Sequence, residues 1–467
     1  MIESGPEKLV RRQRGAFLAG PFGRIVARPW LDPVMLWTLR RQIFPTSRLW
    51  AAAIAADGDS DRFVAGIGRA PARLPARSRL ERAVQRVAAT DRAFRRADRA
   101  WLDAYFDIAP SHAALCEIER EWRRTSQARF AARRFVAPLV RSIRPPAVRF
   151  AIPGPDEVTV GYDPLHPPHV AAPTFDVRIE ESRRISTSLG IEYWLRAASP
   201  LPGDMLWAHV YEPANVQNPP TAILCHGLGI ETEMLNGVVD STLCLLRQGI
   251  RVVHPSAPGH NRRCMPGWYG GEQLLATQPL GAIETLQATA VEFAMLIRWA
   301  RAKSHGAPVA LGGTSLGALT TQFMADRSRD WPSECQPDSL LLATSSALPG
   351  VLSYDSSLAL AVALPAALAA KGWTREALAR LAPLTDPVSP APLPPERIFL
   401  LLGSRDTVTP YDAGMALARL WTLPASNVFL ANRGHFSAAV GLLFDTGPYD
   451  ALAKCLAGRL NEPAPTL

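Results

Sequence analysis

The chain has 467 residues, of which 48% are hydrophobic and 20% are charged, so a chain that is disordered throughout is excluded. This length is enough for one large core with an accessory region, or for two domains. The formal net charge of +9 is unevenly placed: residues 1–150 carry 29 Lys and Arg against 14 Asp and Glu, whereas residues 151–467 carry 22 against 28. The basic first third could attract an anionic partner, or it could simply reflect an Arg-rich coding genome.

The cysteines and the N-terminus give expectations about metal binding and location. The six cysteines are scattered and show no spacing typical of a metal site, so we expect free thiols, no bound metal and a reducing, cytoplasmic setting. The apolar stretch near the N-terminus is broken by Gly, Pro and Arg and does not resemble a secretory signal. We also find no run of the ~20 apolar residues that a membrane-spanning helix needs.

Residues 1–145 are predicted to form a basic helical accessory region. Apolar residues recur at spacings of three and four over 77–106 and 111–143, as in amphipathic helices. Such a region could pack on the rest of the chain, contact an anionic membrane through Trp30, Trp37 and Trp50, or bind nucleic acid. Alternation of Arg and acidic residues around apolar stripes favours packing. No nucleic-acid-binding motif is present, so we expect no nucleic-acid partner.

Residues 146–173 are rich in Pro and Gly and are predicted to be a linker to a second domain, 174–467. In that domain apolar strands alternate with helices, which predicts an α/β fold with a doubly wound, mainly parallel sheet. Ligands of such sheets bind beyond the carboxyl ends of the strands. The predicted strands are 174–180, 206–213, 221–227, 251–257, 308–313, 339–347, 397–403 and 427–432, and the predicted helices are 234–248, 279–304, 315–328, 410–421 and 437–459.

Ser315 is the candidate nucleophile. It lies in Gly313-Thr314-Ser315-Leu316-Gly317, between a predicted strand and a predicted helix. A sharp turn from strand to helix strains the serine backbone and exposes its hydroxyl, and the flanking glycines allow neighbouring chain to pass closely. The alternative is a turn serine without a catalytic role.

A serine hydroxyl needs a base to become a nucleophile, and the base needs an acid that orients it. Asp406 follows the strand predicted at 397–403, and His435 follows the last predicted strand. Both therefore fall at carboxyl ends of strands, where they could meet Ser315. Asp406 could instead be only a turn former or helix cap, in which case Asp386 or Asp355 could be the acid.

An oxyanion hole is predicted from backbone N–H groups. The segment His226-Gly227-Leu228-Gly229 follows a predicted strand, and Leu316 follows the candidate nucleophile. We expect the N–H groups of Leu228 or Gly229, together with that of Leu316, to bind a developing oxyanion. His226 is then a structural residue of the loop and not a second base.

These elements, in this order, resemble the alpha/beta-hydrolase superfamily over about residues 205–460. The resemblance implies that Ser315 is the nucleophile, His435 the general base and Asp406 its orienter, with no metal or organic cofactor. The chain is broadly similar to the esterase, lipase and deacetylase branches. The dehalogenase branch would carry Asp at position 315.

Two further features concern the substrate. Arg262 and Arg263 follow a predicted strand and could bind an anionic group of the substrate, or they could form ion pairs in a solvated loop. Residues 349–396 are predicted to be helical and could form a cap over an apolar pocket, or simply pack against the sheet. We therefore expect hydrolysis of a small-molecule or lipid-like carboxylic ester through an acyl-enzyme. The alternatives are an acyltransferase with the same triad and a catalytically silent scaffold.

Overall fold

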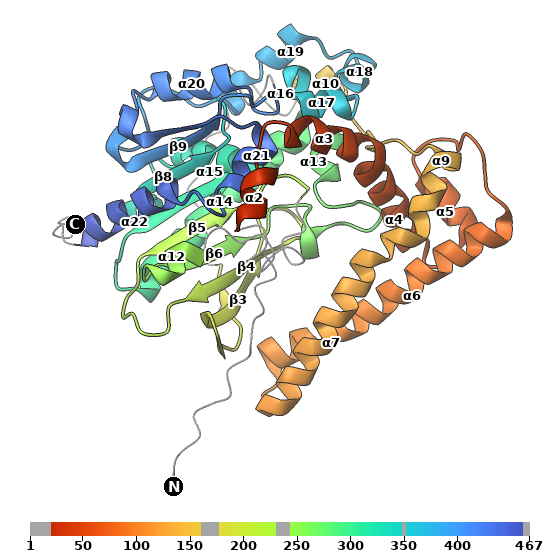
Figure 1. Ribbon diagram of the computed structural model, residues 1–467, viewed down its shortest axis with the longest axis horizontal. Coiled ribbons are helices and arrows are strands. Elements are labelled where there is room, and N and C mark those ends of the chain that lie inside the picture. The colour runs from red at the N-terminus through yellow and green to blue at the C-terminus, as the bar shows by residue number, and fades with distance from the viewer. Residues whose placement is uncertain (1–19, 160–176, 230–242, 348–351, 461–467) are drawn as a thin grey trace.

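The computed structural model describes residues 20–159, 177–229, 243–347 and 352–460. Within these residues a ten-stranded mixed sheet has the order β1-β3-β4-β6-β5-β7-β8-β9-β10, and β2 pairs with β3 (Figure 1). The strands are β1 (Glu180–Glu181), β2 (Ile185–Thr187), β3 (Gly190–Ala198), β4 (Met205–Glu212), β5 (Thr221–Cys225), β6 (Arg251–Pro255), β7 (Val309–Thr314), β8 (Ser339–Ala343), β9 (Ile398–Gly403) and β10 (Val428–Ala431).

Six neighbouring strands of the sheet, in the order β6-β5-β7-β8-β9-β10, are parallel, which confirms the predicted mainly parallel sheet. Every residue of β5, β8 and β9 is buried, because helices cover both faces of this half of the sheet. Strands β1 to β4 add an antiparallel edge. The prediction missed β3 and placed the first strand at 174–180, whereas the described part of that segment is irregular until β1 begins at Glu180.

One core lies on each face of the sheet. On one face, α14 (Leu280–Lys303), α15 (Leu316–Arg327) and α20 (Tyr411–Leu420) pack against the strands. On the other face, α12 (Leu243–Arg247) and α22 (Gly447–Leu460) cover them. The predicted helices at 279–304, 315–328 and 410–421 match α14, α15 and α20 within two residues at each end. Of the predicted helix 234–248, residues 234–242 lie outside the described residues, and the rest contains α12. The predicted helix region 437–459 consists of α21 (His435–Gly441) and α22.

Helix α14 is, among the described residues, the one helix long and apolar enough to cross a membrane by length and composition. In its most apolar window, 72% of the residues are buried inside the protein. This burial is typical of a core helix beneath a sheet.

The N-terminal region is helical, as predicted, over its described residues. Its longest helices, α6 and α7, form an antiparallel hairpin that stands beside the sheet (Figure 1). Aromatic side chains at one end of this hairpin pack on β3 and β4; Trp101, for example, contacts Trp194 edge to face. The helices are α2 (Pro21–Val26), α3 (Leu31–Thr38), α4 (Phe44–Ala56), α5 (Ser60–Gly66), α6 (Arg77–Leu102), α7 (His112–Ala131), α8 (Arg133–Val136) and α9 (Val140–Ile143).

A third core joins the N-terminal helices to the segment that follows β8. Residues 352–396 contain the short helices α16 (Leu352–Asp355), α17 (Ser357–Ala361), α18 (Leu364–Ala369) and α19 (Arg375–Ala379). Their apolar side chains pack in one cluster with those of α4 and α6. The described part of the predicted linker, 146–159, belongs to this cluster through buried Val148 and Ile152, so it is a packed segment; residues 160–173 lie outside the described residues.

Candidate active site

Ser315 lies at the turn between β7 and α15 with a strained backbone, at φ 57° and ψ −117°. A positive φ is unfavourable for a residue with a Cβ, so the surrounding chain must hold this conformation. A Cβ at Gly313 would lie 2.7 Å from the carbonyl oxygen of Cys225, and a Cβ at Gly317 would collide with the same carbonyl. Both glycines are therefore needed for β5 to pass close to the turn, as the sequence motif predicts.

The structure brings Ser315, His435 and Asp406 together in one hydrogen-bonded chain. The Oγ of Ser315 lies 2.9 Å from Nε2 of His435, and Nδ1 of His435 lies 2.8 Å from Oδ2 of Asp406. Asp406 and His435 are both 5% exposed. With Nδ1 protonated and donating to the carboxylate, Nε2 is free to accept the serine proton, which is the arrangement that nucleophilic catalysis by serine requires.

Asp406 also stabilises its own turn. Its Oδ1 accepts hydrogen bonds from the N–H groups of Val408 and Thr409, at 2.8 and 2.9 Å. The hydroxyl of Thr409 donates to Oδ2 at 2.8 Å. The carboxylate of Asp406 therefore contacts both its own turn and the ring of His435.

The two alternative acids have other partners. Asp355 forms a two-pronged ion pair with Arg375, at 2.6 and 2.8 Å. Asp386 accepts a hydrogen bond from the hydroxyl of its neighbour Thr385. The structure therefore places Asp406, and neither alternative, against His435.

Of the predicted oxyanion-hole residues, Leu228 and Leu316 line the same cavity as Ser315. Leu316 is the first residue of α15, so its N–H has no acceptor within the helix. The N–H of Gly229 is already used, because it donates to Nε2 of His260 at 3.1 Å. This bond corrects the prediction that Gly229 could supply a donor and leaves Leu228 and Leu316 as the candidates.

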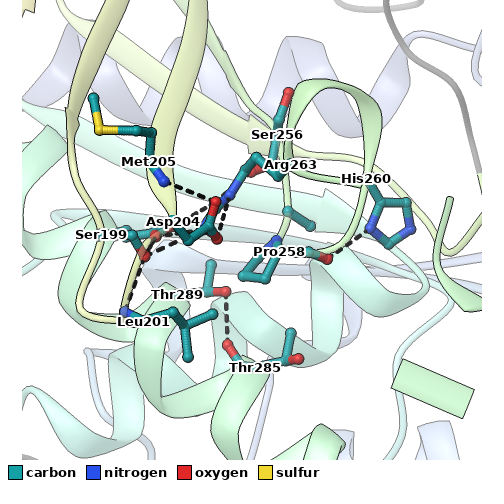
Figure 2. Close-up of polar contacts among 12 residues, drawn as sticks. Ser199, Leu201, Asp204, Met205, Ser256, Pro258, His260, Arg263, Thr285 and Thr289 are labelled. Atoms are coloured by element: carbon teal, nitrogen blue, oxygen red, sulfur yellow. Dashed lines mark hydrogen bonds and ion pairs between the residues drawn. The ribbon is translucent and has the colours of Figure 1, made fainter. Parts of the chain in front are cut away.

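Two histidines, His260, which is buried, and His226, which is partly buried, hold the loop that carries Leu228. His260 donates from Nδ1 to the carbonyl of Pro258 at 2.9 Å (Figure 2) and accepts from Gly229. The ring of His226 accepts from the N–H of Ala257. Burial lowers the pKa of His260 to about 4 and that of His226 to about 3, so both rings are neutral at pH 7. His226 is thus a structural loop residue, as expected.

Arg262 and Arg263 do not face the cavity at Ser315, which corrects their predicted role in binding an anionic substrate. Arg263 is buried and forms ion pairs with Asp204 at 2.6 Å (Figure 2) and with Glu292 at 2.7 Å. Arg262 pairs with Asp98 of α6 at 2.7 Å and lies over the ring of Trp101. The prediction failed because these partners are distant in sequence and internal to the protein.

The cavity at Ser315 has a volume of about 150 Å³. The described side chains that line it are uncharged and mostly aliphatic, and most of them come from α13 (Glu272–Ala276), α14, α15 and the segment 356–385. The cavity can therefore receive an apolar group attached to a carbonyl that reacts at Ser315. Its lining residues are Leu228, Leu274, Leu275, Gln278, Pro279, Ala282, Ile283, Leu286, Ser315, Leu316, Leu319, Ser356, Leu358, Ala359, Leu364, Leu378, Leu381, Thr385, Val408 and Thr409.

Sequence reasoning missed two residues beside the triad. Thr409 follows Asp406 closely enough for its hydroxyl to be a candidate from sequence alone. Asp32 lies in α3 of the N-terminal region and accepts a hydrogen bond from the N–H of Phe436 at 2.7 Å. No sequence signal connects Asp32 to a helix that begins 403 positions later at His435. Among the described residues, no group of three His, Cys, Asp or Glu side chains could hold a metal ion.

The sequence matches no model of a known protein family and no curated protein sequence. Similar solved structures include a cold-adapted esterase from an Arctic intertidal metagenomic library, with 15% identity and a TM-score of 0.39, covering 58% of this chain and 97% of that one. They also include a lipase in its open form, with 16% identity and a TM-score of 0.40, covering 57% and 98%. An acetyl xylan esterase from Thermoanaerobacterium has 12% identity and a TM-score of 0.42, covering 58% and 89%.

These likenesses concern the fold alone. Within the chain itself, six parallel strands carry Ser315 on a turn between β7 and α15, then Asp406 after β9, then His435 after β10. The mainly parallel sheet with helices on both faces, and the placement of these three residues after its strands, are typical of this fold. The chain therefore has the alpha/beta-hydrolase fold, to which the N-terminal helical region is added.

Proposed function

We propose that the protein is a serine hydrolase that cleaves uncharged carboxylic esters with an apolar acyl group. The observation that carries this proposal is the hydrogen-bonded chain from Ser315 through His435 to Asp406, which opens onto an apolar cavity. The hydrogen bonds provide an activated nucleophile, and the cavity provides a place for the acyl group beside it.

The reaction follows from the geometry. Nε2 of His435 takes the proton of the Ser315 hydroxyl while Oγ attacks the ester carbonyl carbon, and the N–H groups of Leu228 and Leu316 hold the resulting oxyanion. The protonated ring then gives its proton to the alcohol oxygen, which leaves, and the acyl group stays on Ser315. His435 next takes a proton from water, whose oxygen attacks the acyl-enzyme, and the acid departs as Ser315 regains its proton.

The cavity sets the size and charge of the acyl group. A cavity of about 150 Å³ lined mostly by aliphatic side chains accommodates a group of about six carbons, such as benzene. No charged side chain stands among the described residues that line it, so an anionic acyl group would lose its hydration without gaining a partner. We therefore expect acyl groups from acetyl to about hexanoyl to be accepted.

The test is hydrolysis of p-nitrophenyl esters by the wild type and by Ser315→Ala. We expect the wild type to turn over these esters and Ser315→Ala to lose at least about 10³-fold in kcat. Ser426→Ala, at an exposed serine far along the chain, is the matched control and should keep wild-type activity. Equal activity of Ser315→Ala and the wild type would contradict the proposal.

We also propose that α2 and α3 contact an anionic membrane surface. Ile25, Trp30, Val34 and Trp37 are large apolar side chains that are each at least 50% exposed. Exposed arginines accompany them at positions 24, 28, 40 and 41, and the one acidic residue within 20–48, Asp32, is buried. Exposed apolar and cationic side chains in a segment that carries no exposed acid suit an anionic lipid interface.

Trp50 does not belong to this surface, which corrects part of the prediction for the N-terminal region. It is 4% exposed, and the guanidinium of Arg133 lies over its ring. The proposed contact therefore concerns Trp30 and Trp37. Helix α3 also contacts α17, whose residues Leu358 and Ala359 line the cavity, so a lipid-like ester at this surface would be close to the site.

A further inference from the structure

Asp32 reaches from the N-terminal region to the helix that carries the candidate base. It lies in the first turn of α3, and its carboxylate binds the first turn of α21, which begins at His435. We propose that Asp32 is a positioning residue that fixes the backbone of His435, so that the N-terminal region is part of the active site and not an accessory. This inference rests on the proposed serine hydrolase function.

The carboxylate of Asp32 is hydrogen-bonded, directly or through one hydroxyl, to residues on both sides of His435. Oδ1 of Asp32 accepts from the N–H of Phe436 at 2.7 Å, and Oδ2 accepts from the hydroxyl of Ser437 at 2.5 Å. The Ser437 oxygen in turn accepts from the N–H of Gly434 at 2.8 Å. Gly434, Phe436 and Ser437 are thus linked to Asp32 directly or through one hydroxyl, and His435 lies between them.

The local structure explains why an acidic residue occupies this place. The first N–H groups of a helix have no acceptor within the helix, and the N-terminus carries partial positive charge. Asp32 lies in the first turn of α3, is 8% exposed, and places its carboxylate at the N-terminus of α21. A Cβ at Gly434 would overlap this carboxylate, so the absence of a side chain there permits the close approach.

A second contact holds the other side of the same loop. Nε of Arg433 donates to the carbonyl of Ala27, at the end of α2, at 3.2 Å. The N-terminal region is therefore hydrogen-bonded to this loop at Arg433 and to α21 at Phe436 and Ser437.

Asp406 and Asp32 hold different parts of His435 and its helix. Asp406 orients the imidazole ring through Nδ1, whereas Asp32 fixes the backbone from which the ring projects. Loss of the Asp32 contacts leaves the N–H of Phe436 without an acceptor and frees the first turn of α21 to shift. A displacement of about 1 Å in catalytic geometry can lower a rate by about 10²-fold.

The experiment compares Asp32→Ala with Asp59→Ala in the full-length protein. Asp59 is a helix-capping control, because its exposed carboxylate accepts from the N–H groups of Asp61 and Arg62, at 2.8 and 3.0 Å, in the first turn of its own helix α5. Both variants lose a helix cap, so both should lower Tm. Only Asp32→Ala should lower kcat, by about 10- to 100-fold with little change in KM, because the base is misplaced while the cavity is intact.

A second measurement reports on the reactivity of Ser315 itself. The rate at which a fluorophosphonate labels Ser315 depends on proton removal by His435, so it should fall in Asp32→Ala by a factor similar to that for kcat. Asp32→Asn keeps an oxygen for the Phe436 N–H but cannot accept from Ser437, and Ser437→Ala removes the same bond from the other side. Both should show a smaller loss than Asp32→Ala.

The outcomes separate this inference from the function on which it rests. A wild type that neither turns over esters nor labels refutes the proposed function, and this inference with it. An active wild type with an Asp32→Ala variant that matches Asp59→Ala in kcat and labelling rate refutes the positioning role alone. If Asp32→Ala does not fold, the milder pair decides: wild-type kcat and labelling rates in both Asp32→Asn and Ser437→Ala would overturn the proposal.

Discussion

Filling the cavity at Ser315 should shorten the acyl chains that the protein prefers. Ala282 lies on α14 and lines the cavity. Ala282→Leu adds three carbons to a space of about 150 Å³, which accommodates about six carbons. The variant should therefore accept acyl groups about three carbons shorter than the wild type does.

The size of the effect follows from burial of methylene groups. Each methylene that enters an apolar site contributes about 0.8 kcal/mol, which is about a 4-fold change in kcat/KM. From propionyl to hexanoyl the acyl chain gains three methylenes, so the wild type should prefer p-nitrophenyl hexanoate by about 2.4 kcal/mol, or about 60-fold. In Ala282→Leu these methylenes have no space, and the ratio should fall to about one.

The assay is kcat/KM for the two esters, because their ratio is independent of the active fraction of each preparation. Ala302→Leu is the matched control, since Ala302 is an exposed residue of the same helix outside the cavity. It should keep the wild-type ratio. If Ala282→Leu also keeps the wild-type ratio, the cavity does not bind the acyl group and the reasoning is refuted.

Three further predictions concern stability and the membrane. Arg48→Ala leaves the fully buried carboxylate of Glu272 without its partner, which should cost about 3–5 kcal/mol at pH 7.5. Burial raises the pKa of Glu272 and Arg48 opposes that rise, so the unpaired Glu272 should take up a proton as pH falls. The difference in unfolding free energy between wild type and Arg48→Ala, measured by urea denaturation, should therefore be smaller at pH 5 than at pH 7.5. An equal difference at both pH values would contradict this. The pKa of His260 is lowered by burial to about 4, below its unfolded value, so its contribution to stability is present above about pH 6.5 and is lost as pH falls towards 4. This loss amounts to about 3 kcal/mol, and His260→Gln should therefore have a flatter decline of unfolding free energy with acid than the wild type; an unchanged slope would show that His260 is not responsible. Replacing Trp30 and Trp37 together by Ser should weaken sedimentation with phosphatidylglycerol vesicles at low salt by at least about 10-fold, and wild type that binds these vesicles no better than phosphatidylcholine vesicles would contradict the membrane contact.

The sheet and the meeting of Ser315, Asp406 and His435 were predictable because each depends on local patterns placed at strand ends. Apolar runs marked the buried parallel strands, and Ser315, Asp406 and His435 each followed one of them. Parallel strands bring their carboxyl ends to one edge, so residues far apart in sequence meet without any pairwise signal. The antiparallel strand β3 was missed, although the hairpin to β2 begins at the turn Ser188-Leu189.

Side-chain pairing between distant elements was not predictable in the same way. Arg262 and Arg263 matched the pattern of an anion-binding loop, yet Asp98 and Glu292 neutralise them inside the protein. The same limitation hid Asp32, because its bond to Phe436 joins residues 404 positions apart. Such contacts depend on how the N-terminal helices dock on the sheet, which the periodicity of those helices does not specify.

Covalent labelling of Ser315 tests the proposed serine hydrolase function most directly. The purified wild type is treated with a fluorophosphonate, its intact mass is measured, and the labelled site is located by peptide mapping, with Ser315→Ala treated in parallel. If Ser315 is the nucleophile, the wild type gains one adduct, located at Ser315, and the variant gains none. A folded wild type without an adduct, or an adduct at another serine that persists in Ser315→Ala, would contradict this role of Ser315.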